Sequence, residues 1–355
     1  MLTKERLSEL FHKIRNLSVI MVGDFFLDKY FVTDPRLSEI SVETGLEARQ
    51  VVQIRCSPGA AGTVVNNLHA LGVGEIRAVG IAGDDGEGYE LNARLQEMGV
   101  NTDSLLRFPF THTPTYMKPM RVINGVEVEM ERLDVKNRTP LTEPMEEQII
   151  ALLNEQLSGR HGWRIPNAVI ISDQVEERNC GVISDRVREA LSDMAKKYPD
   201  TIFFADSRRR IGEFTNIVLK PNRSEALEVL RSEGARDEYE SDKDIATAIS
   251  SLKSTPVFLT SGENGIWVAV NGEANHAKAI RYEGMIDICG AGDSATSGIV
   301  SALASGFSPI EAAEVGNLCA GVTIRKLGTT GTASEEEILS LLDSSLWNNK
   351  EKNPD

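Results

Sequence analysis

Short apolar runs recur along the chain and alternate with stretches of helical periodicity. They lie at residues 18–22, 76–81, 168–172, 201–206, 216–220 and 256–260. A strand that is apolar at every position is buried on both faces, and strands that alternate with helices form a parallel sheet with helices on both sides. The pattern therefore predicts an α/β fold with a mostly parallel central sheet.

Two segments depart from this rhythm and read as an inserted β-sheet. Residues between 30 and 56 are β-like, with weak alternation at 48–54. Residues 115–120 and 126–133 alternate on either side of Asn124-Gly125, a dipeptide typical of a two-residue hairpin turn. We expect these lid segments, at about 30–56 and 108–134, to form a small separate sheet that covers a binding site.

Polar residues follow several of the predicted strands. Asp24 and Asp28 come just after the first strand, and Asp173, residues 206–208 and residues 260–262 follow later ones. In doubly wound sheets, ligands bind at the carboxyl ends of the strands. Solvated turns carry the same residue types. The strand ends are therefore candidates for a site, and other features have to decide between the two interpretations.

A glycine-rich segment, Gly290-Ala291-Gly292-Asp293, opens an apolar stretch with the composition of a helix. The first N–H groups of a helix have no partner within the helix, and glycines let an anion approach them closely. The segment therefore predicts an anion site with a carboxylate beside it. Asp293 is either a group that acts on the bound anion or an ordinary helix N-cap, a position that Asp also favours.

An earlier loop of proline and small residues also leads into a helical pattern. It spans residues 57–63 and includes Gly59, Ala60 and Thr63. Small residues before a helix allow a ligand to lie against the backbone. A tight turn followed by ordinary helix packing is the alternative.

The composition excludes several classes of function. A formal net charge of −15 disfavours a nucleic-acid binder, which needs clustered Lys and Arg to neutralise phosphates. The sequence has no run of about eighteen apolar residues and no secretory leader, so we expect a cytoplasmic protein without a membrane partner. The four cysteines and five histidines lack the spacing of a zinc site or a disulfide framework. Neither a P-loop nor a Rossmann fingerprint is present.

Several elements, in one order along the chain, resemble the signatures of a known family. Residues 287–293 (DICGAGD) are similar to D-T-x-G-A-G-D, residues 222–225 to N-x-x-E and residues 260–265 to T-x-G-x-x-G. On these motifs the chain resembles the ribokinase-like (PfkB) carbohydrate kinases. Within that family it is similar to the heptose-phosphate kinase domain of ADP-heptose synthesis, a likeness carried by residues 23–30, 40–43, 132–134 and 326–329.

The resemblance implies a fold and an activity. The expected fold is a ribokinase-like three-layer α/β/α domain at residues 1–345, with the β-sheet lid inserted in it and a polar tail at 346–355. The expected reaction transfers the γ-phosphoryl group of ATP to a hydroxyl of a sugar or sugar phosphate, with a heptose phosphate as one candidate. A nucleoside kinase of the same fold and a non-catalytic sugar or nucleotide sensor are the alternatives. We expect the kinase alone, without a nucleotidyltransferase domain, and a homodimer formed through the lid.

The resemblance also implies roles for individual residues. Asp293 is the expected general base, and the backbone of Gly290, Ala291, Gly292 and Asp293 is the expected anion hole. The helix N-terminus should keep Asp293 ionised at pH 7. The expected substrate-binding residues are Asp24, Asp28, Gly59, Ala60 and Thr63. The expected nucleotide-binding residues are Asn222, Thr260, Gly262, Gly265 and Arg208. The expected metal ligands are Asn222 and Glu225 for Mg²⁺, directly or through water, and Asp287 for a monovalent cation.

The chain departs from the family pattern mainly on the acceptor side. Ala60 and Thr63 stand where the family has a second glycine and an asparagine, and Ile288 stands where it has threonine. The S-D-Y-x-K-G segment of the heptose kinases reads SDQVEE at residues 172–177. The motifs for phosphoryl transfer therefore match the family more closely than those for the acceptor.

Overall fold

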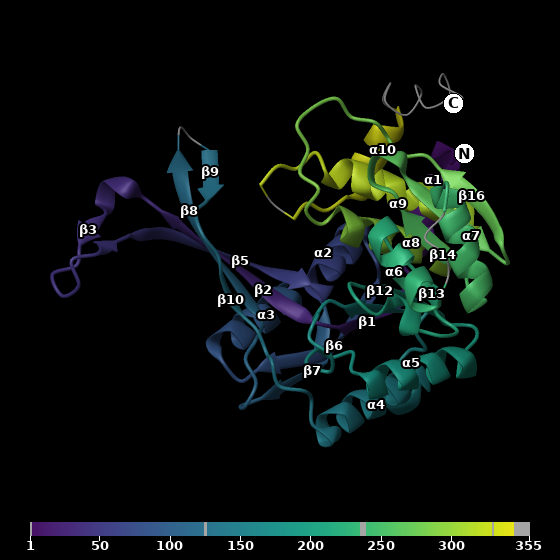
Figure 1. Cartoon of the computed structure of the whole chain (residues 1–355), viewed down its shortest axis with the longest axis horizontal. Coiled ribbons are helices and arrows are strands. Elements are labelled where there is room, and N and C mark those ends of the chain that lie inside the picture. Colours follow the sequence, from purple (N-terminus) through teal and green to yellow (C-terminus); the bar gives the residue numbers. More distant parts are fainter. Residues whose placement is uncertain (1, 124–125, 235–238, 329, 344–355) are drawn as a thin grey trace.

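A nine-stranded sheet forms the centre of the molecule, in the order β16-β15-β14-β13-β12-β11-β1-β6-β7 (Figure 1). The computed structural model describes residues 2–123, 126–234, 239–328 and 330–343. Neighbouring strands from β14 to β7 are parallel, and β15 and β16 add an antiparallel edge. The mostly parallel sheet predicted from the sequence is confirmed. Its strands are β1 (Ser18–Gly23), β6 (Glu75–Gly83), β7 (Asn101–Phe108), β11 (Ala168–Asp173), β12 (Ile202–Ser207), β13 (Val218–Leu219), β14 (Val257–Thr260), β15 (Ile266–Val270) and β16 (Glu273–Ala277).

Helices cover both faces of this sheet and complete a three-layer α/β/α body. One core joins the sheet to α1 (Lys4–Ile14), α2 (Ala61–Leu71), α3 (Gly86–Glu97), α8 (Ala291–Ala304), α9 (Pro309–Thr323) and α10 (Glu335–Asp343). The other core joins it to α4 (Glu143–Leu157), α5 (Asp185–Lys197), α6 (Arg223–Ser232) and α7 (Asp242–Lys253). The apolar stripe of each helix faces the sheet, as amphipathic packing requires.

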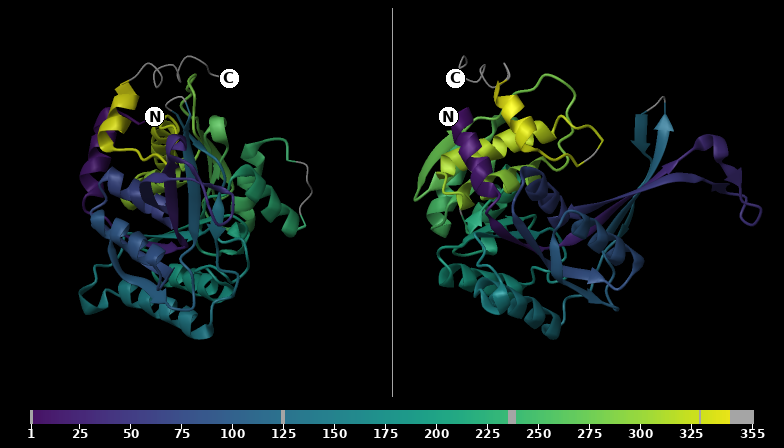
Figure 2. Two further views of the ribbon diagram at one scale, coloured as in Figure 1. Left: turned by 90° about the vertical axis from the view of Figure 1, so that its left-hand side faces the viewer. Right: turned by 180° about the vertical axis from the view of Figure 1, so that it is seen from behind.

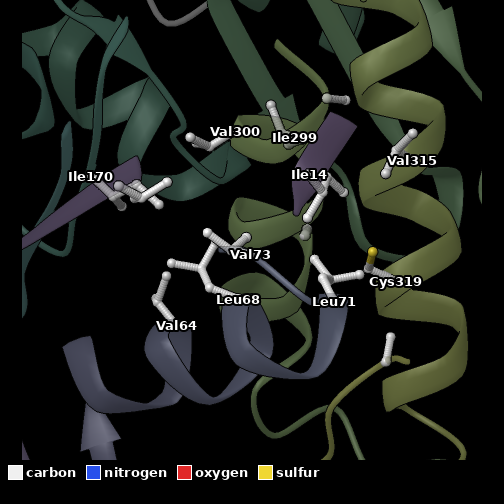
Figure 3. Packing of buried hydrophobic residues seen from close by; sticks show 14 of the residues in the cluster. Ile14, Val64, Leu68, Leu71, Val73, Ile170, Ile299, Val300, Val315 and Cys319 are labelled. Carbon is white, nitrogen blue, oxygen red and sulfur yellow. The ribbon is translucent and has the colours of Figure 1, made fainter. Parts of the chain in front are cut away.

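The start of α8 rests on closely packed helices. Leu68 of α2, Ile299 of α8 and Cys319 of α9 belong to one buried cluster (Figure 3). Two glycines let α8 and α9 approach each other. A Cβ atom would lie 2.7 Å from Cys319 Sγ at Gly298, and 2.7 Å from Ile299 Cγ1 at Gly316. Side chains at these positions would push the helices apart, so the packing holds the N-terminus of α8 in a fixed place.

A second sheet, the lid, projects away from the body (Figures 1 and 2). Its strand order is β10-β8-β2-β5, with β9 paired to the outer part of β8. The strands are β2 (Phe25–Thr33), β5 (Val51–Ala60), β8 (Thr115–Ile123), β9 (Val126–Glu129) and β10 (Leu133–Val135). A two-stranded ribbon of β3 (Glu39–Ile40) and β4 (Glu47–Ala48) forms the far end. Only Asp24 separates β1 of the body from β2 of the lid.

The two faces of the lid differ in chemistry. Register pairs Asp28 with Tyr116 and Tyr30 with Lys118, so these four polar side chains share one face. The opposite face carries Phe31, Ile54 and Pro119, which are aligned across β2, β5 and β8, and Leu133, which lies opposite Met117. Ile54 and Leu133 are 58% and 59% exposed. The lid therefore has a polar face and an apolar face, and the outer part of the apolar face is exposed among the described residues.

Some predicted boundaries need correction. The lid begins at Phe25, before the expected residue 30, so Asp28 lies on a lid strand and not in a loop after β1. Helix α5 begins at Asp185, because Ser184 caps it by accepting the N–H of Val187. The hairpin is confirmed by the pairing of β8 with β9, although Asn124, Gly125 and the tail at 346–355 lie outside the described residues.

Among the described residues, no helix is both long and apolar enough to cross a membrane.

Candidate active site

Gly290 opens α8 with a left-handed conformation. Its φ of 78° is one that a residue with a Cβ rarely adopts. Ile288 accepts the N–H of Ala291 at 3.2 Å, so this N–H is not available to an anion, which corrects the expectation for Ala291. Within the described part of the chain, the N–H groups of Gly292 and Asp293 have no such partner. The candidate anion hole is therefore reduced to two N–H groups and the open space that Gly290 and Gly292 leave.

Asp293 is the third residue of α8 and is not its N-cap, so the N-cap interpretation is wrong. Burial raises the pKa of the Asp293 carboxyl to about 7, with a further upward contribution from the Asp206 carboxylate. Lys220 and Arg208 act in the opposite direction. The helix N-terminus was expected to keep this group ionised at pH 7, whereas burial raises its pKa to about that pH.

Lys220 and Asp206 form a buried ion pair beside Asp293, and sequence reasoning did not single either out for a role. Lys220 Nζ lies 2.8 Å from Asp206 Oδ2, and Lys220 is 5% exposed. Burial lowers the pKa of Lys220, but Asp206 and its neighbouring carboxylates outweigh that and raise it. The same ammonium lies 3.8 Å from the position of a Cβ on Gly292. The sequence pointed only weakly to Lys220, because it follows β13, a strand of two residues.

The small-residue loop ends β5 and begins α2 next to the anion hole. Ala60 is the residue before α2 and has a φ of 53°, a strained conformation for alanine. Thr63 Cγ2 lies 3.6 Å from the position of a Cβ on Gly290. At Gly59 a Cβ would lie 2.8 Å from Asp28 Oδ2, so a larger residue would displace the Asp28 carboxylate. The structure therefore places Thr63 beside Gly290, and Gly59 against Asp28, at the junction of β5 and α2.

Asp28 is nearly buried and pairs with a lysine of the lid. Lys118 Nζ lies 3.0 Å from Asp28 Oδ1 and 3.3 Å from the Tyr30 hydroxyl. Burial lowers the pKa of Lys118, but Asp28 and Tyr30 outweigh that and raise it. Lys118 is a further polar group beside the candidate substrate-binding residue Asp28, and the sequence did not single it out.

Asp24 holds backbone, which differs from the role expected for it. Its carboxylate accepts the N–H groups of Gln174 at 2.8 Å, Val175 at 2.9 Å and Val182 at 2.7 Å. Burial, and then the Asp173 carboxylate, raise the pKa of Asp24 to about 6. The carboxylate thus fixes the loop after β11.

The expected nucleotide side lies at the ends of β13 and β14. Asn222 and Glu225 form a capping box at the start of α6: Asn222 Oδ1 accepts the Glu225 N–H at 3.0 Å, and Glu225 Oε2 accepts the Asn222 N–H at 2.8 Å. Asn222 also forms a parallel bridge with Thr260. Gly262 and Gly265 have φ values of 56° and 95°, which require glycine.

The fit of these residues to Mg²⁺ can be judged from their oxygens. The capping box uses Asn222 Oδ1 and Glu225 Oε2 and leaves Glu225 Oε1 for another partner. No group of three His, Cys, Asp or Glu that could hold a metal occurs in the described ranges. Mg²⁺ often keeps several waters and takes one or two carboxylates together with substrate phosphates. The residues fit such a water-rich site and not a dedicated protein cage.

Asp287 organises the loop before α8. Its carboxylate accepts the N–H of Cys289 at 3.0 Å and that of Gly328 at 3.0 Å. Both oxygens of the candidate ligand for a monovalent cation are therefore engaged with backbone.

A cavity of about 490 Å³ lies between the base of the lid and the loops after β1, β11 and β12. Asp24, Phe26 and Tyr116 contribute to its wall. Four cationic side chains, Arg132, Lys136, Arg138 and Arg208, line it together with the carboxylates of Glu176 and Glu177. Arg208 was expected on the nucleotide side, and the structure places it in the wall of this cavity at the base of the lid.

The family model for pfkB family carbohydrate kinases matches residues 35–336. Two curated relatives are each named bifunctional protein HldE. That of Trichlorobacter lovleyi is 27% identical over 339 residues, covering 95% of this chain and 65% of its own length. That of a Caulobacter species is 30% identical over 334 residues, covering 94% and 64%. The chain thus spans slightly less than two thirds of the length of these relatives.

Solved structures share the fold. A phosphofructokinase-like protein from Staphylococcus aureus has a TM-score of 0.69 at 18% identity, covering 91% of this chain and 95% of its own. Arabidopsis thaliana ribokinase, solved with ribose and ATP, has a TM-score of 0.65 at 18% identity, covering 92% and 99%. The expected ribokinase-like architecture is confirmed. With its signature segment at the start of α8 and a family match over most of its length, the chain belongs to the pfkB family of carbohydrate kinases.

Proposed function

We propose that the protein transfers the γ-phosphoryl group of ATP to a hydroxyl of a phosphorylated sugar, such as a heptose phosphate. The observation that carries this proposal is the position of Asp293. Its carboxyl, with a pKa of about 7, stands at the start of α8 beside the Lys220 ammonium and two N–H groups that have no backbone partner among the described residues. A proton acceptor and a cluster of anion-binding groups thus meet at one point, as phosphoryl transfer to an alcohol requires.

Asp293 acts as the general base in this mechanism. A base is most effective when its pKa lies near the working pH, and such a group contributes about a hundredfold to ten-thousandfold. The N–H groups of Gly292 and Asp293 then hold the oxygens of the phosphoryl group during transfer. Lys220, kept charged by Asp206, adds a cation next to the same point.

The nucleotide lies along the ends of β13 and β14 in this proposal. Thr260, Gly262 and Gly265 form the loop against which its base and ribose rest, and Asn222 and Glu225 hold Mg²⁺ directly or through water. When bound there, Mg²⁺ would supply positive charge that neutralises the phosphates. Asp287 keeps the loop before α8 in shape and is the candidate group near a monovalent cation.

The acceptor lies between the lid and the anion hole. Asp28, Gly59, Ala60 and Thr63 contact its hydroxyls in this proposal, since Thr63 lies beside Gly290 and Gly59 lies against the Asp28 carboxylate. Its far end enters the cavity, which Arg132, Lys136 and Arg138 line. Cationic side chains favour an anionic group there, and this favours a sugar phosphate over a free sugar or a nucleoside.

The test is a substrate panel with MgATP. It contains free ribose, fructose, mannose and heptose, phosphates of the same sugars, and adenosine. We expect turnover with a sugar phosphate and a kcat/KM at least tenfold above that of the matching free sugar. Preference for adenosine would indicate a nucleoside kinase, and binding without turnover across the panel would indicate a sensor. Either result would overturn the proposal.

The apolar face of the lid is the proposed dimer interface. Phe31, Ile54, Pro119 and Leu133 lie on this face, and two of them are more than half exposed. Exposed apolar patches on a sheet commonly mark protein contacts. We expect sedimentation at micromolar concentration to give a dimer that Ile54→Asp converts to a monomer. A monomeric wild-type protein would contradict this.

A further inference from the structure

Three consecutive arginines follow β12, and each is held differently. Arg209 pairs with Glu176 at 2.8 Å, and Arg210 pairs with Asp173 at 3.0 Å. The Arg208 side chain donates from Nε to the amide oxygen of Gln174 at 3.0 Å. Within the described part of the chain, Arg208 makes no ion pair with a carboxylate. Two of the three charges are therefore cancelled locally, and that of Arg208 is not.

Gln174 is itself firmly placed. Its backbone N–H is held by the Asp24 carboxylate at 2.8 Å, and the backbone N–H of Arg208 donates to the Asp173 carbonyl at 3.1 Å. Backbone hydrogen bonds thus hold both residues of the Gln174–Arg208 contact: Gln174 is bound to Asp24, and Arg208 is bound to Asp173. A neutral amide can orient a guanidinium without cancelling its charge, whereas a carboxylate at the same place would form an ion pair.

Arg208 lies between the acceptor side and the reacting centre. It lines the cavity beneath the lid. Its charge also acts on Asp293, Glu225 and Tyr116, which belong to α8, α6 and the lid. A single guanidinium thus lines the cavity and acts through its charge on residues of α8, α6 and the lid.

We propose that Gln174 is a positioning residue, which holds Arg208 as an uncancelled cation so that its terminal nitrogens contact the phosphoryl group during transfer. This rests on the proposed function. Arginine suits the role because its planar fork binds phosphate oxygens in pairs. The contact forms as charge spreads over the transferring group, so its loss lowers kcat more than it raises KM for the acceptor.

The pH profile gives an independent readout. The charged groups that face Asp293 are Asp206 and Arg208 from β12 and the loop after it, and Lys220 from the end of β13, with the Cys289 thiol in the preceding loop. Arg208 lowers the pKa of Asp293. Cancelling its charge therefore moves the acid limb of the kcat profile to higher pH, an effect that a merely structural residue would not have.

The experiment uses the full chain, MgATP and the best sugar phosphate of the panel. Gln174→Glu is nearly isosteric but cancels the charge of Arg208, and we expect kcat to fall at least tenfold with the acid limb raised. In an Arg208→Ala background the same substitution should cause less than a twofold further loss. Arg209→Ala, which removes a neighbouring arginine outside the cavity, should stay within twofold of wild type.

The outcomes separate the two proposals. If the wild type turns over no sugar phosphate, the proposed function fails, and this inference fails with it. If the wild type is active and Gln174→Glu stays within twofold of Arg209→Ala, only the inference fails. Thermal unfolding checks that each variant is folded, and Gln174→Ala, expected to lose threefold to tenfold in kcat, replaces Gln174→Glu if the latter unfolds. An unchanged kcat for Gln174→Ala would also overturn the inference.

Discussion

We expect the ionised Asp293 carboxylate to lower the free energy of unfolding, and the substitution Asp293→Asn tests this. Burial and Asp206 move the pKa of its carboxyl from 3.8 to about 7. A tenfold change in proton affinity corresponds to about 1.4 kcal/mol, so the ionised carboxylate costs the folded state at most about 4 kcal/mol. Asp293 is half-buried, and water at its exposed side reduces the expected cost to about 2 kcal/mol.

The sign follows from linkage. A carboxyl whose folded pKa is raised binds protons more tightly in the folded state, so folding loses stability as the pH rises from 3.8 to about 7. Asparagine has no such ionisation. We expect Asp293→Asn to be more stable than the wild type by about 2 kcal/mol at pH 8, with the gain shrinking steadily toward pH 4.

Urea unfolding at pH 8, 6 and 4.5 measures the stability, and a coupled assay with MgATP and the best acceptor measures turnover. Asp287→Asn is the matched control, because the Asp287 carboxylate is held by two backbone N–H groups and should give no gain. Turnover of Asp293→Asn should fall at least a hundredfold. A gain that is equal at all three pH values, or turnover within a few-fold of wild type, would refute the reasoning.

Three further substitutions are predicted. Ala60→Gly should raise the free energy of unfolding by about 1 kcal/mol, since relief of the positive φ exceeds the entropy cost of glycine; a loss of stability in urea unfolding would contradict this. Asp24→Ala should cost at least about 3 kcal/mol, because three backbone N–H groups lose their acceptor. A weaker acceptor affinity at unchanged stability would instead favour the original sugar-hydroxyl role. Lys220→Met should lower turnover at pH 7 at least tenfold and move the acid limb of the pH profile upward, because Asp206 would then face Asp293 unpaired; an unmoved acid limb would exclude Lys220 from the site.

The layered body could be predicted because its signal is local. Apolar runs at regular intervals, such as 168–172, specify strands buried on both faces, and the strand residues fall where the pattern put them. The start of α8 was also predictable, because a positive φ favours glycine and Gly290 has a positive φ. The start of the lid was not, because Phe25 to Leu27 are as apolar as a central strand. Their pairing with residues 58–60 is a long-range contact that sequence alone does not specify.

Site residues that belong to a sequence motif were predicted. Those whose role depends on contacts with residues far away in the sequence were missed. Lys220 gains its meaning from Asp206 and Asp293, which lie 14 positions before it and 73 after it along the chain. The role of Asp24 depends on the N–H groups of residues 174–182. Whether an N–H group is available to an anion also depends on the turn before the helix. Here the Ile288 carbonyl accepts the N–H of Ala291.

The single residue between β1 and β2 gives the lid the mechanics of a lever. Strand β2 has nine residues, so it reaches roughly 30 Å from the body at 3.3 Å per residue, and a rotation of about 10° at its root would sweep its far end through roughly 5 Å. Asp24 is the fulcrum, and its side chain is bound to residues 174, 175 and 182. A large displacement of the far end of the lid would therefore reach the loop that contains Gln174 as a much smaller displacement.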